Sequence, residues 1–200
     1  MIHGAQQPVQ HAQPAWLEDF QKAPVTYTLM GTCAAVHIIS GLARSTFLYY
    51  GALQVQRVMQ GEVWRVATHA FLHSSVLHLG LNLFSLYIYR DVESRIGSLG
   101  VVATTVAALA FTLLAEIAFT NWHVRSLGIS GVCFALRGVK VGIEGGNVCE
   151  IAQRALKHIC EQPFEILGYI GLSALGVRIG HLAHLSGFLA GVVVGRFYAG

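Results

Sequence analysis

Long stretches without charged residues alternate along the chain with short segments that carry them. A helix needs about 20 mainly apolar residues to cross the hydrocarbon core of a bilayer. Three stretches reach that length, namely those bounded by Lys22 and Arg44, by Arg65 and Arg90, and by Arg95 and Glu116. Three later stretches are shorter but equally apolar. We therefore predict six membrane spans, at residues 25–42, 75–91, 98–119, 130–146, 163–178 and 181–198.

Two segments lie outside these predicted spans. Residues 1–24 are rich in glutamine and proline and lack the pattern of a signal peptide, so we expect a flexible polar tail before a membrane domain at 25–200. The connection 42–74 is long, and long ordered loops are often functional. Six spans put both termini on one side, and a mild excess of lysine and arginine there predicts that this side is cytoplasmic.

The composition supports a membrane protein and excludes other classes. Hydrophobic residues make up 54% of the chain and charged residues only 12%, about half the share typical of soluble domains. A disordered chain would be poor in hydrophobic residues. The net charge of +3 is small and no basic run occurs, so nucleic acid is not an expected partner. We predict an all-α, polytopic integral membrane protein whose surroundings are the lipid bilayer.

A few uncharged polar side chains lie inside the predicted spans, where such groups are costly and by default mark function. Spans two, four and six enter the bilayer from the same face. His78 and Asn82 share one side of span two, because residues four apart face the same way. Ser130 opens span four, and His184 lies about one turn into span six. All four side chains therefore occupy similar depths, in the half of the membrane opposite the termini.

This set of residues predicts acyl-transfer chemistry. A serine hydroxyl becomes a good nucleophile when a neighbouring base, usually histidine, removes its proton. The tetrahedral intermediate then needs hydrogen-bond donors for its oxyanion, which Asn82, His78 and the backbone N–H of Ser130 can supply. Gly128 and Gly131 would let the backbone approach a substrate at a helix N-terminus. No in-membrane aspartate is evident as a third member, so we propose a dyad of Ser130 and His184.

Each of these residues also has a structural interpretation. Gly-x-Ser-Gly alone is compatible with helix packing through small residues. It also differs from the Gly-x-Ser-x-Gly elbow of soluble hydrolases, since Val132 occupies the last position. His184 and Asn82, taken singly, are compatible with hydrogen bonds between helices. Their shared depth is what favours a site.

The other histidines and the cysteines raise the question of a metal site. His69, His73 and His78 are clustered, and His181 precedes His184 by three residues, a spacing that metal ligands can use. However, His69 and His73 lack the glutamate of a His-Glu-x-x-His zinc protease, and the four cysteines form no Cys-x-x-Cys pair. We expect no metal and no cofactor.

Several motifs occur in a fixed order along the chain. They are Glu62-Val-Trp-Arg-Val-Ala-Thr-His-Ala-Phe-Leu-His73, Leu77-His-Leu-Gly-Leu-Asn-Leu83, Gly128-Ile-Ser-Gly131, and Ala183-His184 followed by Gly187 and Gly191. Together they resemble the rhomboid family of intramembrane serine proteases over roughly residues 60–198. The resemblance implies a six-helix core, Ser130 as nucleophile, His184 as general base, and Asn82 with His78 as oxyanion donors.

The resemblance implies further roles. The loop with Trp64 and Arg65 would be the partly embedded element that steadies the bundle beside the active site. Phe134 would pack on the catalytic imidazole, and a small-residue seam at Gly187, Gly191 and Gly195 would let span six approach span four. Members of the family cleave single-span transmembrane substrates within or near the bilayer, so substrates of that class are the expected partners.

Span four departs from the family pattern because it contains Arg137 and Lys140. We expect Lys140 to pair with Glu144 at i+4 and to reach the cytoplasmic interface, whereas the sequence indicates no partner for Arg137. Residues 144–162 mix glycine, charge and cysteine without clear periodicity, which leaves the packing of spans four and five undefined.

Three functions are compatible with these observations. An active rhomboid-type protease is the leading hypothesis. The alternative is a rhomboid-like pseudoprotease that binds transmembrane clients for trafficking or degradation, although such relatives typically lack the serine or the histidine. A transporter or haem-binding bundle would need charged residues along a continuous path, whereas here they concentrate at the ends of the spans.

Overall fold

A computed structural model of the chain describes residues 14–161, 167–168, 170–171, 174 and 180–199. These residues form helices, and the only bridge between extended segments that they contain joins Leu53 to Ser126. The helices are α1 (Ala15–Lys22), α2 (Pro24–Ser40), α3 (Arg44–Gly51), α4 (Val55–Met59), α5 (Arg65–Thr68), the 3₁₀ helix η1 (His69–Phe71), α6 (Val76–Ile88), α7 (Asp91–Phe119), α8 (Ser130–Glu144), α9 (Val148–Cys160) and α11 (His181–Arg196). The prediction of an all-α fold is confirmed for this part of the chain.

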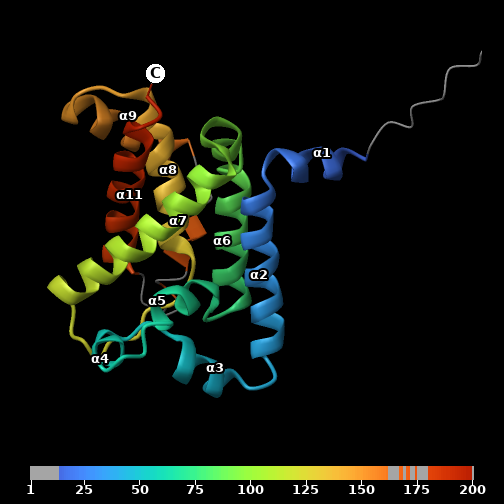
Figure 1. Ribbon diagram of the computed structural model, residues 1–200, viewed down its shortest axis with the longest axis vertical. Helices are drawn as coiled ribbons and strands as arrows, with labels where there is room; N and C mark the ends of the chain where they lie inside the picture. Colours follow the sequence, from blue (N-terminus) through green and yellow to red (C-terminus); the bar gives the residue numbers. More distant parts are fainter. Residues whose placement is uncertain (1–13, 162–166, 169, 172–173, 175–179, 200) are drawn as a thin grey trace, which may run out of the picture.

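Helices α2 and α6 form one side of the bundle, and α8 and α11 form the other (Figure 1). Helix α2 lies along α6, and α11 packs against α8, while α7 runs obliquely across the bundle and contacts both α8 and α11. The short helices α3, α4 and α5 gather at one end. Helix α1 and the C-terminus lie at the other end.

Five of the six predicted spans contain a helix: α2, α6, α7, α8 and α11. The remaining predicted span, span five at 163–178, falls mostly outside the described residues. Within the described ranges, α7 alone is both long and apolar enough to cross a membrane by itself. Up to three spans result if α1 with α2, bent by 103°, and α5–η1 with α6, bent by 97°, each count as one. The chain thus has at least one candidate span, and six spans remain a prediction.

Glycines in the left-handed region set two helix boundaries. Gly97, with φ of 72°, interrupts α7 after its first turns, so the regular part of the helix begins at the predicted start of span three. Gly145 (φ 71°) and Gly146 (φ 101°) end α8 at Glu144, two residues before the predicted end. A residue with a Cβ atom adopts such angles only at a cost, whereas glycine adopts them freely.

Helices α8 and α11 pack against each other through a seam of small residues. A Cβ atom added to Gly191 would overlap the Ala135 carbonyl oxygen, and one added to Gly187 would overlap that of Gly131. From the other helix, a Cβ on Gly138 would overlap the Phe188 carbonyl oxygen. The predicted glycine seam is therefore confirmed, because only glycine lets the two backbones approach this closely.

A buried carboxylate fixes the beginning of α2. Glu93, at the start of α7, accepts hydrogen bonds from the backbone N–H groups of Val25 (3.0 Å) and Thr26 (2.9 Å) and from the Thr26 hydroxyl (2.8 Å). The first N–H groups of a helix have no partner inside it, so this side chain satisfies donors that would otherwise be unpaired. Helix α2 is thereby tied to α7.

Two segments are more ordered than the sequence indicated. Of the expected flexible tail at 1–24, the part that the structure describes contains α1, whereas residues 1–13 lie outside the described residues. Residues 144–162, which we judged to lack periodicity, contain the helix α9. That interpretation was wrong, because Val148, Ala152 and Leu156 recur at four-residue steps and form an apolar stripe.

Candidate active site

Ser130 and His184 come together where α8 and α11 both begin. The Ser130 Oγ atom lies 3.0 Å from the His184 Nε2 atom, although the two residues are 54 positions apart. Ser130 is the first residue of α8 and is buried, and His184 lies one turn into α11. The glycine seam places them at this distance, because it holds the first turns of the two helices together. A serine hydroxyl that hydrogen-bonds to an imidazole can act as a nucleophile.

Phe134 lies against the imidazole. The rings of Phe134 and His184 are stacked, with centroids 4.3 Å apart and an angle of 9° between the planes. Phe134 follows Ser130 by one helical turn, so it lies on the same face of α8. The stacked ring restricts rotation of the histidine and keeps its Nε2 atom directed at the serine.

His78 and Asn82 lie beside Gly128, two residues before the serine. A Cβ atom built on Gly128 would lie 2.8 Å from His78 Nε2 and 3.6 Å from Asn82 Nδ2. Because φ of Gly128 is 105°, glycine is required here both by the backbone conformation and by the space. The backbone N–H of Ser74 donates to His78 Nδ1 at 3.4 Å, which favours the tautomer that carries its proton on Nε2. Both side chains can therefore offer an N–H group near Ser130.

The orientation of Asn82 is fixed by its neighbours. The amide Nδ2 donates to the His78 carbonyl oxygen at 3.0 Å, and the thiol of Cys133 donates to the Asn82 Oδ1 atom at 3.8 Å. The second hydrogen of Nδ2 remains for another acceptor. Gly131 packs nearby, where an added Cβ would lie 3.1 Å from Thr112 Oγ1. Any larger residue at this position would press on the wall of the site.

The loop with Trp64 and Arg65 supports the segment that leads to Ser130. Arg65 is buried, and it donates to the Ala52 carbonyl oxygen (2.8 Å) and to the Glu62 carboxylate (2.7 Å). The hydrogen bond from Arg65 is the main reason why the pKa of Glu62 lies below its usual value. Trp64 is half exposed, and its indole N–H donates to the Tyr50 carbonyl oxygen at 3.1 Å.

Backbone hydrogen bonds at two places join this loop to the residues before Ser130. Leu53 and Ser126 exchange a pair of backbone hydrogen bonds, each 2.9 Å long. The N–H of Gly128 donates to the His69 carbonyl oxygen, also at 2.9 Å. The long connection between α2 and α6 therefore holds residues 126–128 in place directly before the nucleophilic serine.

A cavity of about 550 Å³ opens beside Ser130 and His184. Its wall includes His69, His78, Gly128 and the buried side chain of Glu116. Glu116 accepts a hydrogen bond from the Ser126 hydroxyl at 2.7 Å. Glu116 was not among the predicted site residues, because in the sequence it only marks the end of a charge-free stretch. A carboxylate at the end of an apolar helix is the signal that could have identified it.

The clustered histidines make separate contacts instead of converging on one point. His69 bonds the Arg65 carbonyl oxygen through Nδ1 at 2.9 Å, and the rings of His73 and His78 meet edge to face at 5.1 Å. His181 lines the cavity. Among the residues that the structure describes, no three His, Cys, Asp or Glu side chains are arranged to hold a metal ion.

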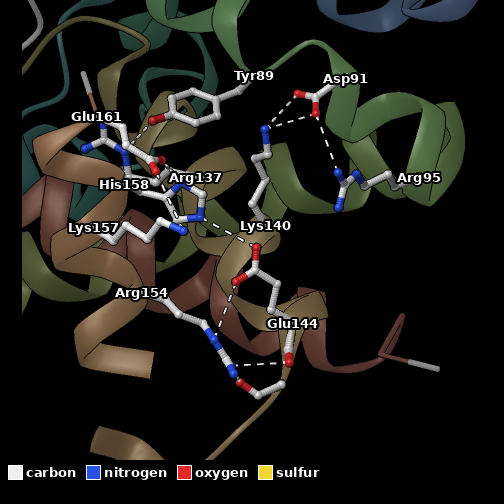
Figure 2. A network of polar contacts seen from close by, with 11 residues as sticks. Tyr89, Asp91, Arg95, Arg137, Lys140, Glu144, Arg154, Lys157, His158 and Glu161 are labelled. Carbon is white, nitrogen blue, oxygen red and sulfur yellow. Dashed lines mark hydrogen bonds and ion pairs between the residues drawn. The ribbon is translucent and has the colours of Figure 1, made fainter. Parts of the chain in front are cut away.

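The two cations of α8 contact residues at the junction of α6 and α7 (Figure 2). Arg137 is buried, and its Nε donates to the Tyr89 hydroxyl at 2.6 Å. Lys140 pairs with Asp91 at 3.0 Å. Our prediction that Lys140 pairs with Glu144 was wrong, because Glu144 contacts α9 instead, through Arg154 at 3.5 Å.

Comparison with known sequences places this chain in a family. A sequence model of the Rhomboid domain matches residues 60–200. Among similar proteins are those named Rhomboid protease GlpG from Yersinia pseudotuberculosis serotype I, 28% identical over 186 residues, and from Yersinia enterocolitica serotype O:8, 28% identical over 180 residues. Both alignments cover 87% of this chain and 62% of the relative, so the chain spans about three fifths of the length of these relatives. The chain belongs to the rhomboid family and is an integral membrane protein.

Proposed function

We propose that this chain is an intramembrane serine endopeptidase that cleaves transmembrane substrates within or near the bilayer. The observation that carries the proposal is the 3.0 Å contact between Ser130 Oγ and His184 Nε2 at the wall of a cavity. Membership of the rhomboid family and similarity to proteins named rhomboid proteases support the same activity. The expected substrates are single-span membrane proteins, whose peptide bonds become accessible where the helix unwinds.

In the proposed first step, Ser130 Oγ attacks the carbonyl carbon of the scissile bond while His184 Nε2 takes the hydroxyl proton. The carbonyl oxygen becomes an oxyanion, which accepts hydrogen bonds from Asn82 Nδ2, from His78 Nε2 and from backbone N–H groups at the start of α8. His184 then gives its proton to the leaving amine, and an acyl-enzyme remains on Ser130.

In the second step, a water molecule attacks the acyl-enzyme with His184 again acting as base, and the carboxylic acid is released. Phe134 holds the imidazole in place in both steps, Gly128 and Gly131 leave room for the substrate backbone, and Trp64 and Arg65 hold the supporting loop. No cofactor takes part in this chemistry. The polar side chains in the cavity wall, among them Glu116 and His181, can bind the water that hydrolysis requires.

We also propose that the chain crosses the membrane six times with both termini on the cytoplasmic side. The position of α1 and the C-terminus at one end of the bundle supports this orientation. The proposed site then opens toward the opposite side, where α3, α4 and α5 lie.

The decisive experiment reconstitutes the full chain with a single-span substrate and compares wild type with Ser130→Ala and His184→Ala. Matched controls are Ser45→Ala and His123→Ala, since both residues are exposed and lie outside the cavity lining. We expect cleavage by wild type and both controls and none by the two site variants. Equal cleavage by the site variants would exclude the dyad. Substrate binding without cleavage by wild type would instead favour a client-binding pseudoprotease.

A further inference from the structure

Helix α9 has three different faces. A partly buried face, with Ile151, Arg154, Ala155 and His158, turns toward the bundle. The two remaining faces are exposed. One is apolar and consists of Val148, Ala152 and Leu156, and the other is polar and consists of Glu150, Gln153 and Lys157.

The face toward the bundle contains two polar side chains, Arg154 and His158, that contact the end of α8. Arg154 Nε lies 3.5 Å from the Glu144 carboxylate, and His158 Nε2 lies 3.7 Å from it (Figure 2). Arg154 also donates to the carbonyl oxygen of Gly145. These contacts attach α9 to the end of α8 and fix its rotation about its own axis.

That rotation leaves the apolar stripe uncovered. The side chains of Val148 and Leu156 are 82% and 62% exposed. Residues four apart lie on one stripe of a helix, and Gln153 and Lys157 lie about 100° further around. An amphipathic helix with one apolar and one polar exposed face is the arrangement found at a membrane–water boundary.

The position of α9 along the bundle agrees with such a boundary. Its first residue follows the last residue of α8 by four positions, so the connection reaches at most about 14 Å. Helix α11 ends at the same level, because a Cβ atom built on Gly145 would lie 2.9 Å from Arg196 Nη1. The last turn of α11 and the residue that follows it also expose apolar side chains, with Val193 at 51% and Phe197 at 83%.

Charged side chains of both signs surround α9 and the adjoining ends of α7 and α8 (Figure 2). Arg95 and Lys140 pair with Asp91, Arg154 pairs with Glu144, and Lys157 pairs with Glu161. Ion pairs of this kind are typical of the water-exposed ends of membrane helices rather than of the hydrocarbon core. Because the chain is an integral membrane protein, an apolar stripe beside such ion pairs favours lipid as the occupant of this face.

We propose that α9 lies in the interfacial region of the bilayer at the end of the bundle that carries the C-terminus, with Val148, Ala152 and Leu156 toward the acyl chains and Glu150, Gln153 and Lys157 toward water. The contacts of Glu144 with α9 then join the end of α8 to the membrane surface. This assignment depends on the chain being a membrane protein and is independent of the proposed proteolysis.

The test uses the full chain in vesicles of equal parts phosphatidylcholine and phosphatidylglycerol. The exposed cysteines are replaced (Cys149→Ser, Cys160→Ser), and the buried Cys33 and Cys133 are kept. Single cysteines are then introduced as Ala152→Cys or Leu156→Cys on the apolar face and as Gln153→Cys or Lys157→Cys on the polar face. Each carries an environment-sensitive fluorophore, which is quenched from the lipid by nitroxide acyl chains or from the water by iodide.

We expect the labels at 152 and 156 to emit at shorter wavelength, to lose most of their fluorescence to lipid nitroxide and to resist iodide. The labels at 153 and 157 should behave in the opposite way. Equal quenching at 156 and 157 would overturn the assignment of faces. Protection of 156 from both quenchers, with cross-linking between copies, would show a protein interface instead. Fluorophores on the native Cys149 and Cys160, in the otherwise unaltered chain, provide a second measurement that needs no introduced cysteine. Both cysteines lie at the border between the apolar and the polar face, so quenching by lipid nitroxide and by iodide is expected. Quenching by iodide alone would overturn the proposal. None of these readouts requires proteolysis.

Discussion

The two ends of α8 use polar residues in opposite ways. At its first turn, Ser130 and the neighbouring His184 and Asn82 are uncharged and hydrogen-bonded within a buried site. At its last turns, Lys140 and Glu144 are charged and pair with residues of other helices. A buried charge is costly without a partner, whereas an uncharged polar group needs only a hydrogen bond. The same helix can therefore carry a candidate site at one end and ion pairs at the other, while its middle is tightly packed against α11 and its one buried cation, Arg137, has the Tyr89 hydroxyl as a partner.

The largest effect is expected from disturbing that packed middle. Gly191→Ala would place a Cβ atom on the Ala135 carbonyl oxygen, so both the fold and the Ser130–His184 contact should be lost. Overpacking a core costs about 1–3 kcal/mol when side chains can adjust, and backbone atoms adjust less. Thermal unfolding of the purified protein measures the loss. Gly80→Ala is the matched control, because nothing lies within 4 Å of a Cβ there. Equal stability of the two variants would contradict the conclusion that only glycine at position 191 lets α8 and α11 pack this closely.

The second largest effect is expected near the first turn of α8, where the polar side chains carry no formal charge. Asn82→Ala should leave the protein folded but lower the cleavage rate about 10²–10³-fold, as for other oxyanion donors. The measurement is the initial rate on a reconstituted single-span substrate, with unfolding followed in parallel. A loss below about tenfold would remove Asn82 from the proposed site, since one donor is worth more than that.

An effect of intermediate size is expected in the middle of α8, at the buried hydrogen bond between Arg137 and Tyr89. Tyr89→Phe removes the hydroxyl that accepts from Arg137 Nε and leaves a buried donor without this partner, so we expect a loss of about 1–3 kcal/mol in the free energy of unfolding. Arg137→Met removes the donor as well, so the loss in the double variant should be smaller than the sum of the losses in the two single variants. Additive losses in this double-mutant cycle would show that the hydrogen bond contributes little.

The smallest effect is expected at the charged end. The Lys140 side chain is 20% exposed and that of its partner Asp91 is 46% exposed. Pairs of this kind are typically worth less than about 1 kcal/mol because solvent screens them. Lys140→Met should therefore change unfolding only slightly and leave cleavage unchanged. A loss as large as that of Tyr89→Phe would remove the contrast between the buried and the exposed cation of α8.

Some of these features could be predicted because they are local. The spacing of charged residues located the helices α2, α6, α8 and α11 to within a few residues, and glycine spacing predicted the seam. Helix α9 was not predicted, because charge-free stretches do not reveal a four-residue apolar stripe among charges. The predicted pair of Lys140 and Glu144 was wrong because an i+4 ion pair is worth only a few tenths of a kcal/mol, so partners on other helices can replace it.

The sequence by itself determined which segments are apolar enough to be helices in a membrane and which polar residues interrupt them, because both properties depend on residues close together in the chain. It also placed Ser130, His184, His78 and Asn82 at similar depths. Only the tertiary structure decided that Arg137 meets Tyr89, that Lys140 meets Asp91, and that Glu116 lines the cavity. These partners come from other helices, and their meeting depends on how closely and at what angle the helices pack. No local spacing encodes that geometry.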